Sequence, residues 1–425
     1  MAPVETSGDR SSLNIKGETI PPYLKPHPEE GHCPKHVSGR SYMRPASPII
    51  SSSTLLRVRS PPCWDFLVAS VCLITDATRT GVKECERVVA DHAGSKDETI
   101  PQTNVSETTY FIIAGFSDLP VLQSIIPVLV LFIYLVTLGG NMMIMLLVCQ
   151  DRQLHTPMYF FICNLSIFDI CCSTNNLHNI LISFISGDKT ISVTSCLAQI
   201  YIFLTLTCGE LFILAAMSYD RYVAICDPLH YSTIMNGRAC VLLSASCWLW
   251  GALENIPILL QLCNFTCYKS NVINHFFCDV MPMIKLTCND TTFLELYILT
   301  VGVFIAAFCP FFLTIMSYVF IVISTLKIRS TIGRRKAFYT CSSHLTVFIL
   351  LYMTLAIQYM RPHSLVDLNS NKLISLFNAA AVPILNPLIY SLKNKDIIAA
   401  FKRRQQNNHK HTAKSIKNYL QRNEE

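Results

Sequence analysis

The chain has 425 residues, of which 51% are hydrophobic and only 15% are charged, and its formal net charge is +6. A soluble domain typically carries about 25% charged residues. Here the apolar residues are gathered in blocks, which indicates a membrane protein. The basic residues lie in short loops and in the C-terminal tail rather than on one amphipathic face, which argues against a nucleic-acid partner.

Residues 1–103 differ in kind from the rest of the chain, because they are rich in Pro, Ser and charge and show no helical or strand periodicity. Such a composition predicts disorder. The apolar run Phe66–Thr75 is too short to span a membrane. We interpret this N-terminal extension as an upstream exon or a gene-model artefact and assign no function to it.

Apolar stretches long enough to cross a bilayer follow one another along the rest of the chain. A spanning helix needs roughly 20 residues to cross about 30 Å of hydrocarbon. Inside lipid every backbone polar group must be satisfied locally, and the alternating pattern of a membrane barrel is missing from this sequence. The sequence therefore predicts an all-α seven-helix bundle with spans at Ile125–Val148, Pro157–Ile185, Val193–Ile225, Ala239–Leu260, Phe293–Leu326, Phe338–Tyr359 and Leu373–Leu392.

The loops predict the orientation of this bundle. Most loop Lys and Arg residues follow the third, fifth and seventh spans, including Arg238, Arg334, Arg335 and Lys402. Because basic loops stay in the cytoplasm, the N-terminus is expected outside and the C-terminus inside. We expect a short amphipathic helix after the seventh span, and a cytoplasmic tail at residues 403–425.

Cysteines and glycosylation sequons fit the outer side of this topology. Cys196 opens the third span, and Cys267, Cys278 and Cys288 lie in the long second outer loop. Four cysteines allow three pairings, so the spacing alone leaves the pairing open. Asn104 is the best glycosylation candidate, because its sequon lies on the expected outer tail before the first span.

Two acidic residues, Asp169 and Glu210, fall at mid-membrane depth in the second and third spans. An unpaired charge there is costly, so the two carboxylates are expected to share a proton, hold a cation or face a polar cavity. A purely structural polar network between the helices is the alternative. A sodium or proton site that stabilises the resting state is the functional interpretation of the pair.

Several motifs occur in order along the region from Asn104 to Lys402, and together they resemble the odorant receptors, a branch of the rhodopsin-like G-protein-coupled receptors. They are PMYFFICNLSIFD (Pro157–Asp169), MSYDRYVAICDPLHY (Met217–Tyr231), NVINHFFCD (Asn271–Asp279), KAFYTCSSHL (Lys336–Leu345) and PILNPLIYSLKNKD (Pro383–Asp396). The HFFCD element is similar to the tetrapod-expanded class. The resemblance implies a receptor domain over residues 104–402 and disulfide bonds Cys196–Cys278 and Cys267–Cys288. It also favours the sodium or proton site at Asp169 and Glu210 over a purely structural network.

The resemblance also implies a face that couples to the G protein. Asp220, Arg221 and Tyr222 end the third span, and the corresponding residues on the fifth to seventh spans are Tyr318, His344, Asn386, Pro387 and Tyr390. Two ordinary interpretations remain. The Asp220–Arg221 pair could simply stabilise a helix end, and His344 could be a core histidine with satisfied hydrogen bonds.

An odorant pocket is expected in the outer half of the bundle. Helical spacing places Phe203, Leu204, Thr207 and Cys208 on one face of the third span. The resemblance adds Asn255, Ile258, Gly302, Ala306, Tyr352, Leu355, Ala356, Tyr359, Leu376 and Ala379. This wall is largely apolar and suits a small, mostly neutral organic molecule. Ordinary helix packing is the alternative for each residue.

The resemblance implies a receptor that binds an odorant in its bundle and activates a stimulatory G protein, which raises cAMP. No nucleophile triad, phosphate-binding loop or zinc-ligand spacing is visible, so we expect no enzyme and no cofactor apart from a sodium ion. The expected partners are the odorant, the G protein and membrane lipid, and the expected location is the plasma membrane of olfactory sensory neuron cilia. The alternatives are a receptor for a non-odorant small molecule outside the nose, and a non-signalling product trapped by its N-terminal extension.

Overall fold

The computed structural model describes residues 109–115, 120–359 and 368–423. The N-terminal extension and Asn104 lie outside these described residues. Within them, seven helical segments are long and apolar enough to cross a membrane: Ile125–Gln150, Pro157–Ser186, Val193–Cys226, Gly237–Cys263, Thr292–Lys327, Thr331–Gln358 and Ile374–Ser391. The predicted all-α bundle of seven spans is therefore confirmed.

Some spans are single helices and others are divided. The single ones are α2 (Pro120–Gln150), α5 (Val193–Cys226), α12 (Thr331–Tyr359) and α13 (Leu368–Lys393). The second span is α3 (Pro157–Ser173), a π-helical turn η2 (Thr174–His178) and α4 (Asn179–Ser186); the fourth is α7 (Gly237–Glu254) and α8 (Ile256–Cys263). The fifth is α10 (Thr292–Tyr297), a π-helical segment η3 (Ile298–Phe308) and α11 (Cys309–Lys327). Pro257 and Pro310 lie in the first turns of α8 and α11, where a missing N–H is tolerated.

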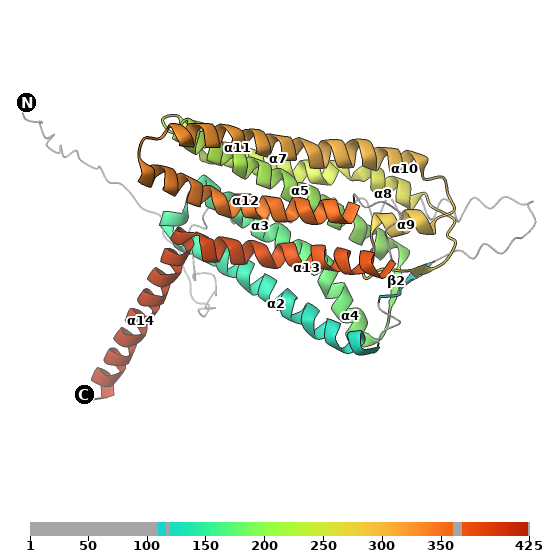
Figure 1. Cartoon of the computed structure of the whole chain (residues 1–425). Coiled ribbons are helices and arrows are strands. Elements are labelled where there is room, and N and C mark those ends of the chain that lie inside the picture. Colours follow the sequence, from blue (N-terminus) through green and yellow to red (C-terminus); the bar gives the residue numbers. More distant parts are fainter. Residues whose placement is uncertain (1–108, 116–119, 360–367, 424–425) are drawn as a thin grey trace, which may run out of the picture. The chain divides into compact units, whose positions relative to one another are not determined.

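Helix α5 runs through the middle of the bundle, with α3 and α7 beside it (Figure 1). Glycines permit this close packing. A Cβ atom on Gly251 of α7 would lie 2.6 Å from the carbonyl oxygen of Thr205, and one on Gly209 of α5 would meet the ring of Phe168. Small residues at helix interfaces let backbones approach, which favours association in lipid.

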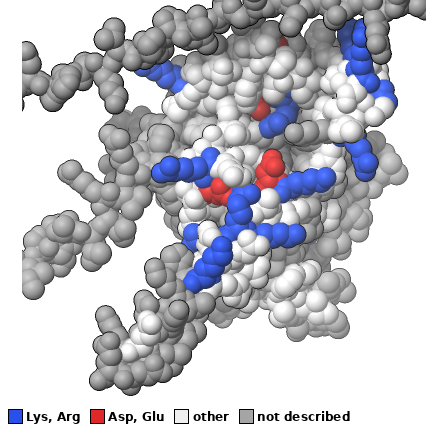
Figure 2. Space-filling view, turned by 90° about the vertical axis from the view of Figure 1, so that its left-hand side faces the viewer, with Lys and Arg blue, Asp and Glu red and all other residues white. Residues whose placement is uncertain are grey.

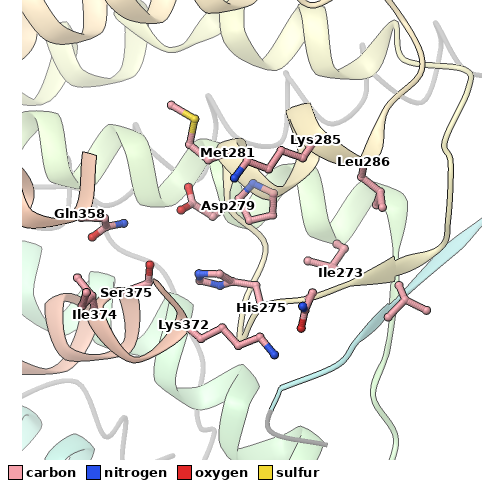
Figure 3. Close-up of a pocket in the computed structure, with 13 residues that line it drawn as sticks. Ile273, His275, Asp279, Met281, Lys285, Leu286, Gln358, Lys372, Ile374 and Ser375 are labelled. Atoms are coloured by element: carbon pink, nitrogen blue, oxygen red, sulfur yellow. The ribbon is translucent and has the colours of Figure 1, made fainter. Parts of the chain in front are cut away.

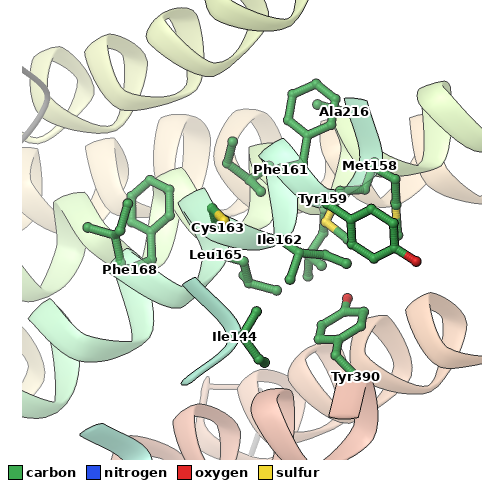
Figure 4. Packing of buried hydrophobic residues seen from close by; sticks show 14 of the residues in the cluster. Ile144, Met158, Tyr159, Phe161, Ile162, Cys163, Leu165, Phe168, Ala216 and Tyr390 are labelled. Carbon is green, nitrogen blue, oxygen red and sulfur yellow. The ribbon is translucent and has the colours of Figure 1, made fainter. Parts of the chain in front are cut away.

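The core around α3 combines apolar packing with a satisfied polar contact. Phe161, Ile162 and Leu165 are almost fully buried, and Figure 4 shows α3 side chains lying near Ile144 and Tyr390. The buried Asn164 accepts hydrogen bonds at its Oδ1 from Ser244 (2.7 Å) and from the indole N–H of Trp248 (3.1 Å). Asn164 begins an Asn-Leu-Ser glycosylation sequon in the second span, and its burial rules out glycosylation there.

A small sheet closes one end of the bundle, which we call the sheet end. Strand β1 (Tyr110–Ile113) pairs antiparallel with β2 (Thr190–Ser192) and parallel with β3 (Val272–Ile273). The segment before the first span is thereby joined to the first two of the three loops that the sequence predicts to be outside. Short helix α9 (Val280–Leu286) follows β3 in the second of these loops.

The opposite end carries α14 (Lys395–Asn423), and we call it the α14 end. At 29 residues, α14 is much longer than the short helix predicted after the seventh span, and it continues through the expected tail. Its first turns bury Ile397 and Ala400, whereas Phe401 is 48% exposed. Arg403 forms an ion pair of 2.6 Å with Asp151, which caps the short 3₁₀ helix η1 (Arg152–Leu154) between α2 and α3. Helix α6 (Tyr231–Ile234) lies in the loop that follows α5.

Candidate functional site

The two intramembrane acids meet at one amide. Nδ2 of Asn386, on α13, donates to Asp169 at 2.9 and 3.2 Å and to Glu210 at 3.3 Å. All three residues are at least nine-tenths buried. Two carboxylates so close cannot both be ionised without a compensating cation, because like charges in a buried site repel strongly. The arrangement therefore suits a shared proton or a bound monovalent cation.

A second amide joins the same helices nearby. Nδ2 of Asn141 on α2 donates to the backbone carbonyls of Thr137 (3.1 Å) and Pro383 (3.2 Å). The Pro383 carbonyl is available because Pro387, four residues later, has no N–H to donate to it. The polar network thus links α2, α3, α5 and α13 at the level of the acids.

Arg221 lies at the α14 end of α5, beside the buried carboxylate of Asp220. Their side chains form an ion pair of 3.4 Å, and the hydroxyl of Tyr231 donates to Asp220 Oδ1 at 2.8 Å. The side chain of Arg221 is 16% exposed, whereas that of Asp220 is fully buried. Asp220 is therefore the buried member of the pair, held by the hydrogen bond from Tyr231, and Arg221 is the member that reaches the surface.

His344 on α12 connects α11 with α5. Its Nε2 lies 3.0 Å from the carbonyl oxygen of Leu214, and its Nδ1 lies 2.7 Å from the hydroxyl of Tyr318. A carbonyl oxygen can only accept, so Nε2 carries the proton and Nδ1 accepts from Tyr318. The sequence left a core histidine as the alternative; the structure shows a buried histidine that holds α12 against α5, two turns from Arg221.

The remaining residues of the expected coupling face lie around this contact. Tyr390 is 1% exposed, and its hydroxyl has no hydrogen-bond partner within the described part of the chain. Pro387 packs against Gly140 of α2, where a Cβ atom would lie 3.0 Å from the proline ring. Tyr222 packs against Phe320 of α11, with ring centroids 6.0 Å apart. The α14 ends of α5 and α11 are therefore in contact through aromatic side chains.

The surface at this end is basic. Figure 2 shows Lys and Arg side chains gathered over it, with few acidic ones between them. The exposed basic residues that the structure describes here include Arg152, Arg238, Lys327, Arg329, Arg334, Arg335, Lys395, Lys402 and Arg404. A surface of this kind attracts an acidic protein partner and anionic lipid headgroups.

Part of the expected odorant wall comes together in the structure. Phe203, Leu204, Tyr352 and Leu355 belong to the main hydrophobic cluster, and Leu204 also contacts the cluster at the sheet end that contains Ile258. The hydroxyl of Tyr352 donates to the carbonyl of Ala307 at 3.0 Å, which joins α12 to the π-helical segment η3. Helix α12, which carries Tyr352 and Leu355, therefore contacts the fifth span at its π-helical segment η3.

Other members of the expected wall lie elsewhere or are engaged locally. Leu376 and Ala379 pack in a separate cluster with Phe276 and Phe277 of the outer loop. The amide of Asn255 donates to the carbonyl of Gly251 in its own helix at 2.7 Å. Ala306 is buried, whereas Thr207, Gly302 and Ala356 are partly buried. The side chain of Tyr359 lies outside the described part of the chain.

Glu254 on α7 is a polar residue of this region that the sequence reading missed. It is 8% exposed, and its Oε2 accepts a hydrogen bond from the thiol of Cys208 at 3.3 Å. The hydroxyl of Tyr297 donates to its backbone carbonyl at 2.8 Å. Among the described residues no basic side chain pairs with it. The signal was present, because an acid inside an apolar span marks a functional position as Asp169 and Glu210 did.

The second outer loop is tied down over the sheet end. The structure contains both disulfides implied by the resemblance, Cys196–Cys278 and Cys267–Cys288, each with Cα atoms 5.4 Å apart. The N–H of Cys278 also donates to Gln199 Oε1 on α5 at 3.0 Å. Phe277 next to it faces Phe203, with ring centroids 5.8 Å apart. The loop therefore rests directly on the residues that begin the expected pocket.

Two titratable groups in this loop give it a testable pH dependence. Burial lowers the pKa of His275 to about 4, although its hydrogen bond to the Phe277 carbonyl opposes the shift. Burial raises the pKa of Asp279 to about 6, against a hydrogen bond from Val280 N–H. The folded state thus releases the His275 proton more readily than the unfolded state and retains the Asp279 proton more tightly.

Between about pH 4 and pH 6 these two pKa shifts have opposite effects on how the free energy of unfolding changes with pH. His275 makes stability rise with pH, because the unfolded state binds more protons there, and Asp279 makes stability fall. For Asp279→Asn, we expect the melting temperature of the variant minus that of wild type to increase with pH across this window. For His275→Asn, we expect the same difference to decrease. Each effect is on the order of 2 to 3 kcal/mol across the window. Thermal unfolding of the detergent-purified chain measures it; relative slopes of the same sign would contradict the assignment.

Comparison with known proteins agrees with this geometry. A family model described as olfactory receptor matches residues 130–407. The chain is 44% identical over 298 residues to olfactory receptor 5M5 of Mus musculus, covering 70% of this chain and 93% of that protein. It is 44% identical over 299 residues to olfactory receptor 5I1 of Homo sapiens, covering 69% and 93%.

A solved structure shares the fold. The crystal structure of squid rhodopsin superposes with a TM-score of 0.52 at 20% sequence identity, covering 67% of this chain and 85% of the rhodopsin chain. Olfactory receptors are multi-pass membrane proteins of the G-protein-coupled receptor type, which signal to a G protein in response to a small molecule and are not enzymes. On the combined evidence of its fold, its motifs and its relatives, this chain belongs to the olfactory receptor family.

Proposed function

We propose that this receptor binds a small, mostly neutral organic odorant within its helical bundle and activates a stimulatory G protein, which raises cAMP. The observation that carries the proposal is the contact of His344 with the Leu214 carbonyl, two turns from Arg221. It is a single hydrogen bond between two helices, and a ligand that binds better to the arrangement without it shifts the population toward that arrangement.

Support for the ligand class comes from the residues of the expected odorant wall. Phe203, Leu204 and Leu355 are apolar and lie in one cluster. Cys208 and Glu254 place a hydrogen-bonding pair beside them. Apolar pockets with a few placed polar groups suit small organic ligands whose orientation one hydrogen bond fixes. We therefore expect odorants with a hydrocarbon body and a single polar group.

Support for the orientation comes from the basic surface. Because Lys and Arg are retained on the cytoplasmic side, the α14 end faces the cytoplasm and the sheet end faces outward. The proposed location is the plasma membrane, in the cilia of olfactory sensory neurons. In this orientation the G protein meets the surface around Arg221, and the odorant enters past the disulfide-bonded loop.

A panel of volatile compounds applied to cells with a cAMP reporter tests the function. At least one neutral volatile should raise cAMP with saturable dose dependence in cells that display the receptor. Surface labelling with and without residues 1–100 distinguishes a trapped product from a functional one. A response only to non-volatile compounds, or none from well-displayed receptor, would contradict the odorant assignment.

We further propose that Asp169 and Glu210 hold a sodium ion or a shared proton in the resting state. Their common contact with Asn386 supports this, because the amide alone cannot neutralise two acids. Glu210→Gln removes one of the two competing charges, so basal activity should change and its dependence on sodium and pH should weaken. Indifference to sodium, pH and the substitution would leave a structural polar network as the explanation.

A further inference from the structure

A separate cavity of about 230 Å³ lies at the sheet end, between the second outer loop and the ends of α12 and α13 (Figure 3). Its walls come from β3, the loop after it, α9 and the two helices. Among the side chains that the structure describes, none from the expected odorant wall or from the coupling face lines this cavity. The cavity is therefore distinct from the odorant site proposed above.

One wall of the cavity offers a hydrogen-bond donor that is not used. Gln358, at the end of α12, accepts a hydrogen bond at its Oε1 from Asn378 at 2.6 Å. This bond fixes the amide, and in Figure 3 the Nε2 atom points toward the middle of the cavity. Nε2 is buried and has no hydrogen-bond partner within the described part of the chain. A buried donor without a partner costs free energy, so the site favours a ligand that supplies an acceptor.

The charges that face the cavity balance one another. Lys285 on α9 is cationic, and Asp279, which caps α9, is anionic near neutral pH because burial raises its pKa only to about 6. His275 is uncharged there, because burial lowers its pKa to about 4. Lys372 also lines the cavity, but its Nζ is engaged by the Gly115 carbonyl at 2.8 Å, and we give its charge no part in binding. A neutral ligand preserves this balance, whereas an ionic one would bring an unpaired charge into a partly enclosed site.

Much of the remaining wall is apolar. Ile273, Met281, Leu286 and Ile374 contribute to it, and a hydrocarbon chain would find contacts there. The volume is below that of most pockets for drug-sized ligands, which run upward from about 300 Å³. A small molecule with a hydrocarbon chain and one oxygen acceptor therefore satisfies both the apolar wall and the free donor of Gln358.

We propose that this cavity is a second binding site, for small neutral aliphatic carbonyl compounds, whose oxygen accepts a hydrogen bond from Gln358 Nε2 while the chain packs against Met281 and Leu286. The bound molecule contacts the disulfide-held loop on one side and α12 and α13 on the other. One consequence alone rests on the proposed function: because the odorant enters past this loop, the cavity would hold a neutral odorant before it reaches the bundle.

Photolabelling of the full-length receptor, purified in detergent, tests the proposal without an agonist. The probe is heptan-2-one with a diazirine near the end of its chain, and it should label the segment Val272–Leu286 saturably. Unmodified heptan-2-one should compete at concentrations at least about tenfold lower than heptanoate or heptylamine, which are ionised near neutral pH.

Two variants and their controls test the assigned contacts. Gln358→Leu removes the donor and should weaken competition by heptan-2-one about fivefold. Met281→Trp fills the cavity from α9 and should abolish saturable labelling of Val272–Leu286. The matched controls are Gln153→Leu and Lys269→Trp, at exposed positions that do not line the cavity, and both should behave as wild type.

Each outcome decides the proposal. Absence of saturable labelling at Val272–Leu286 would overturn it, as would labelling there that survives Met281→Trp, competition by heptanoate equal to that by heptan-2-one, or unchanged competition in Gln358→Leu. Melting temperatures of the variants close to that of wild type show that lost binding is not lost fold. A negative result leaves the cAMP response to volatile compounds untouched, so failure of this site and failure of the proposed function are separable.

Discussion

Arg221→Ala should reduce odorant-driven G-protein activation to less than about a tenth of the wild-type response while surface display stays within about twofold. The guanidinium is partly exposed at the α14 end, and its only described ion-pair partner is Asp220, its neighbour in the helix. Asp220 keeps the hydrogen bond from Tyr231 to its Oδ1 after the substitution. We therefore expect the interaction lost to be one that Arg221 makes with the G protein in the active arrangement.

Two variants make this result specific. Arg238→Ala removes an exposed arginine from the same basic surface and should leave the response within about twofold, since exposed charges contribute weakly one at a time. Tyr231→Phe removes the hydrogen bond to Asp220 and tests whether the pair acts through stability instead. A normal cAMP response from well-displayed Arg221→Ala receptor, measured with any agonist that the volatile panel identifies, would remove Arg221 from the coupling face.

The spans were predictable because length and apolarity alone determine them in a bilayer. The stretch from Val193 to Ile225 can only cross, and the structure places a helix at Val193–Cys226. The π-helical segment Ile298–Phe308 carried no such signal, because its composition is that of an ordinary span. Within it the Ala307 carbonyl accepts a hydrogen bond from the Tyr352 hydroxyl, a contact between residues far apart in sequence.

The length of α14 shows a different limit. Its middle, from Lys402 to Thr412, is polar on all sides and gives no amphipathic period. The segment Lys395–Asn423 also contains no Gly or Pro that would end a helix, and this absence was the better guide. The helix begins on apolar contacts of Ile397 and Ala400 and then continues because nothing in the sequence stops it.

Single residues of the candidate site could be predicted from sequence motifs. Their hydrogen-bond partners, which lie far away in the sequence, could not. Asp169, Glu210 and Asn386 were each visible in the sequence, but one amide serving both acids is a result of the fold. His344 is the buried histidine with satisfied hydrogen bonds that the sequence left as an alternative, and its contact with the Leu214 carbonyl, 130 residues away, could be found only from the fold. Leu376 and Ala379 were assigned to the odorant wall by resemblance, and only the structure shows that they pack in one cluster with Phe276 and Phe277.

Cys278→Ser should destabilise the receptor by about 4 kcal/mol and lower both surface display and agonist potency. The bond joins residues 82 apart, and in the chain-entropy model a crosslink over such a loop restricts the unfolded ensemble by about that amount. The second bond, Cys267–Cys288, closes a loop of 21 residues and should contribute less, about 3 kcal/mol. The potency effect has a separate cause, because Phe277, next to Cys278, faces Phe203 where the odorant wall begins.

The Cys196–Cys278 pairing itself can be tested more strictly than by the loss of stability in one variant. Cys196→Ser should reproduce the defect of Cys278→Ser, and the double variant should be no worse than either single one, because all three lack the same bond. Cys288→Ser should lower the melting temperature by less and leave Phe277 in contact with Phe203, so agonist potency should change little. Peptide mapping of the non-reduced protein checks the bonds directly. A peptide joining Cys278 to Cys267 or to Cys288 would contradict the pairing, and since Cys278 is the point at which the loop is tied to α5, it would also displace the loop from above the pocket.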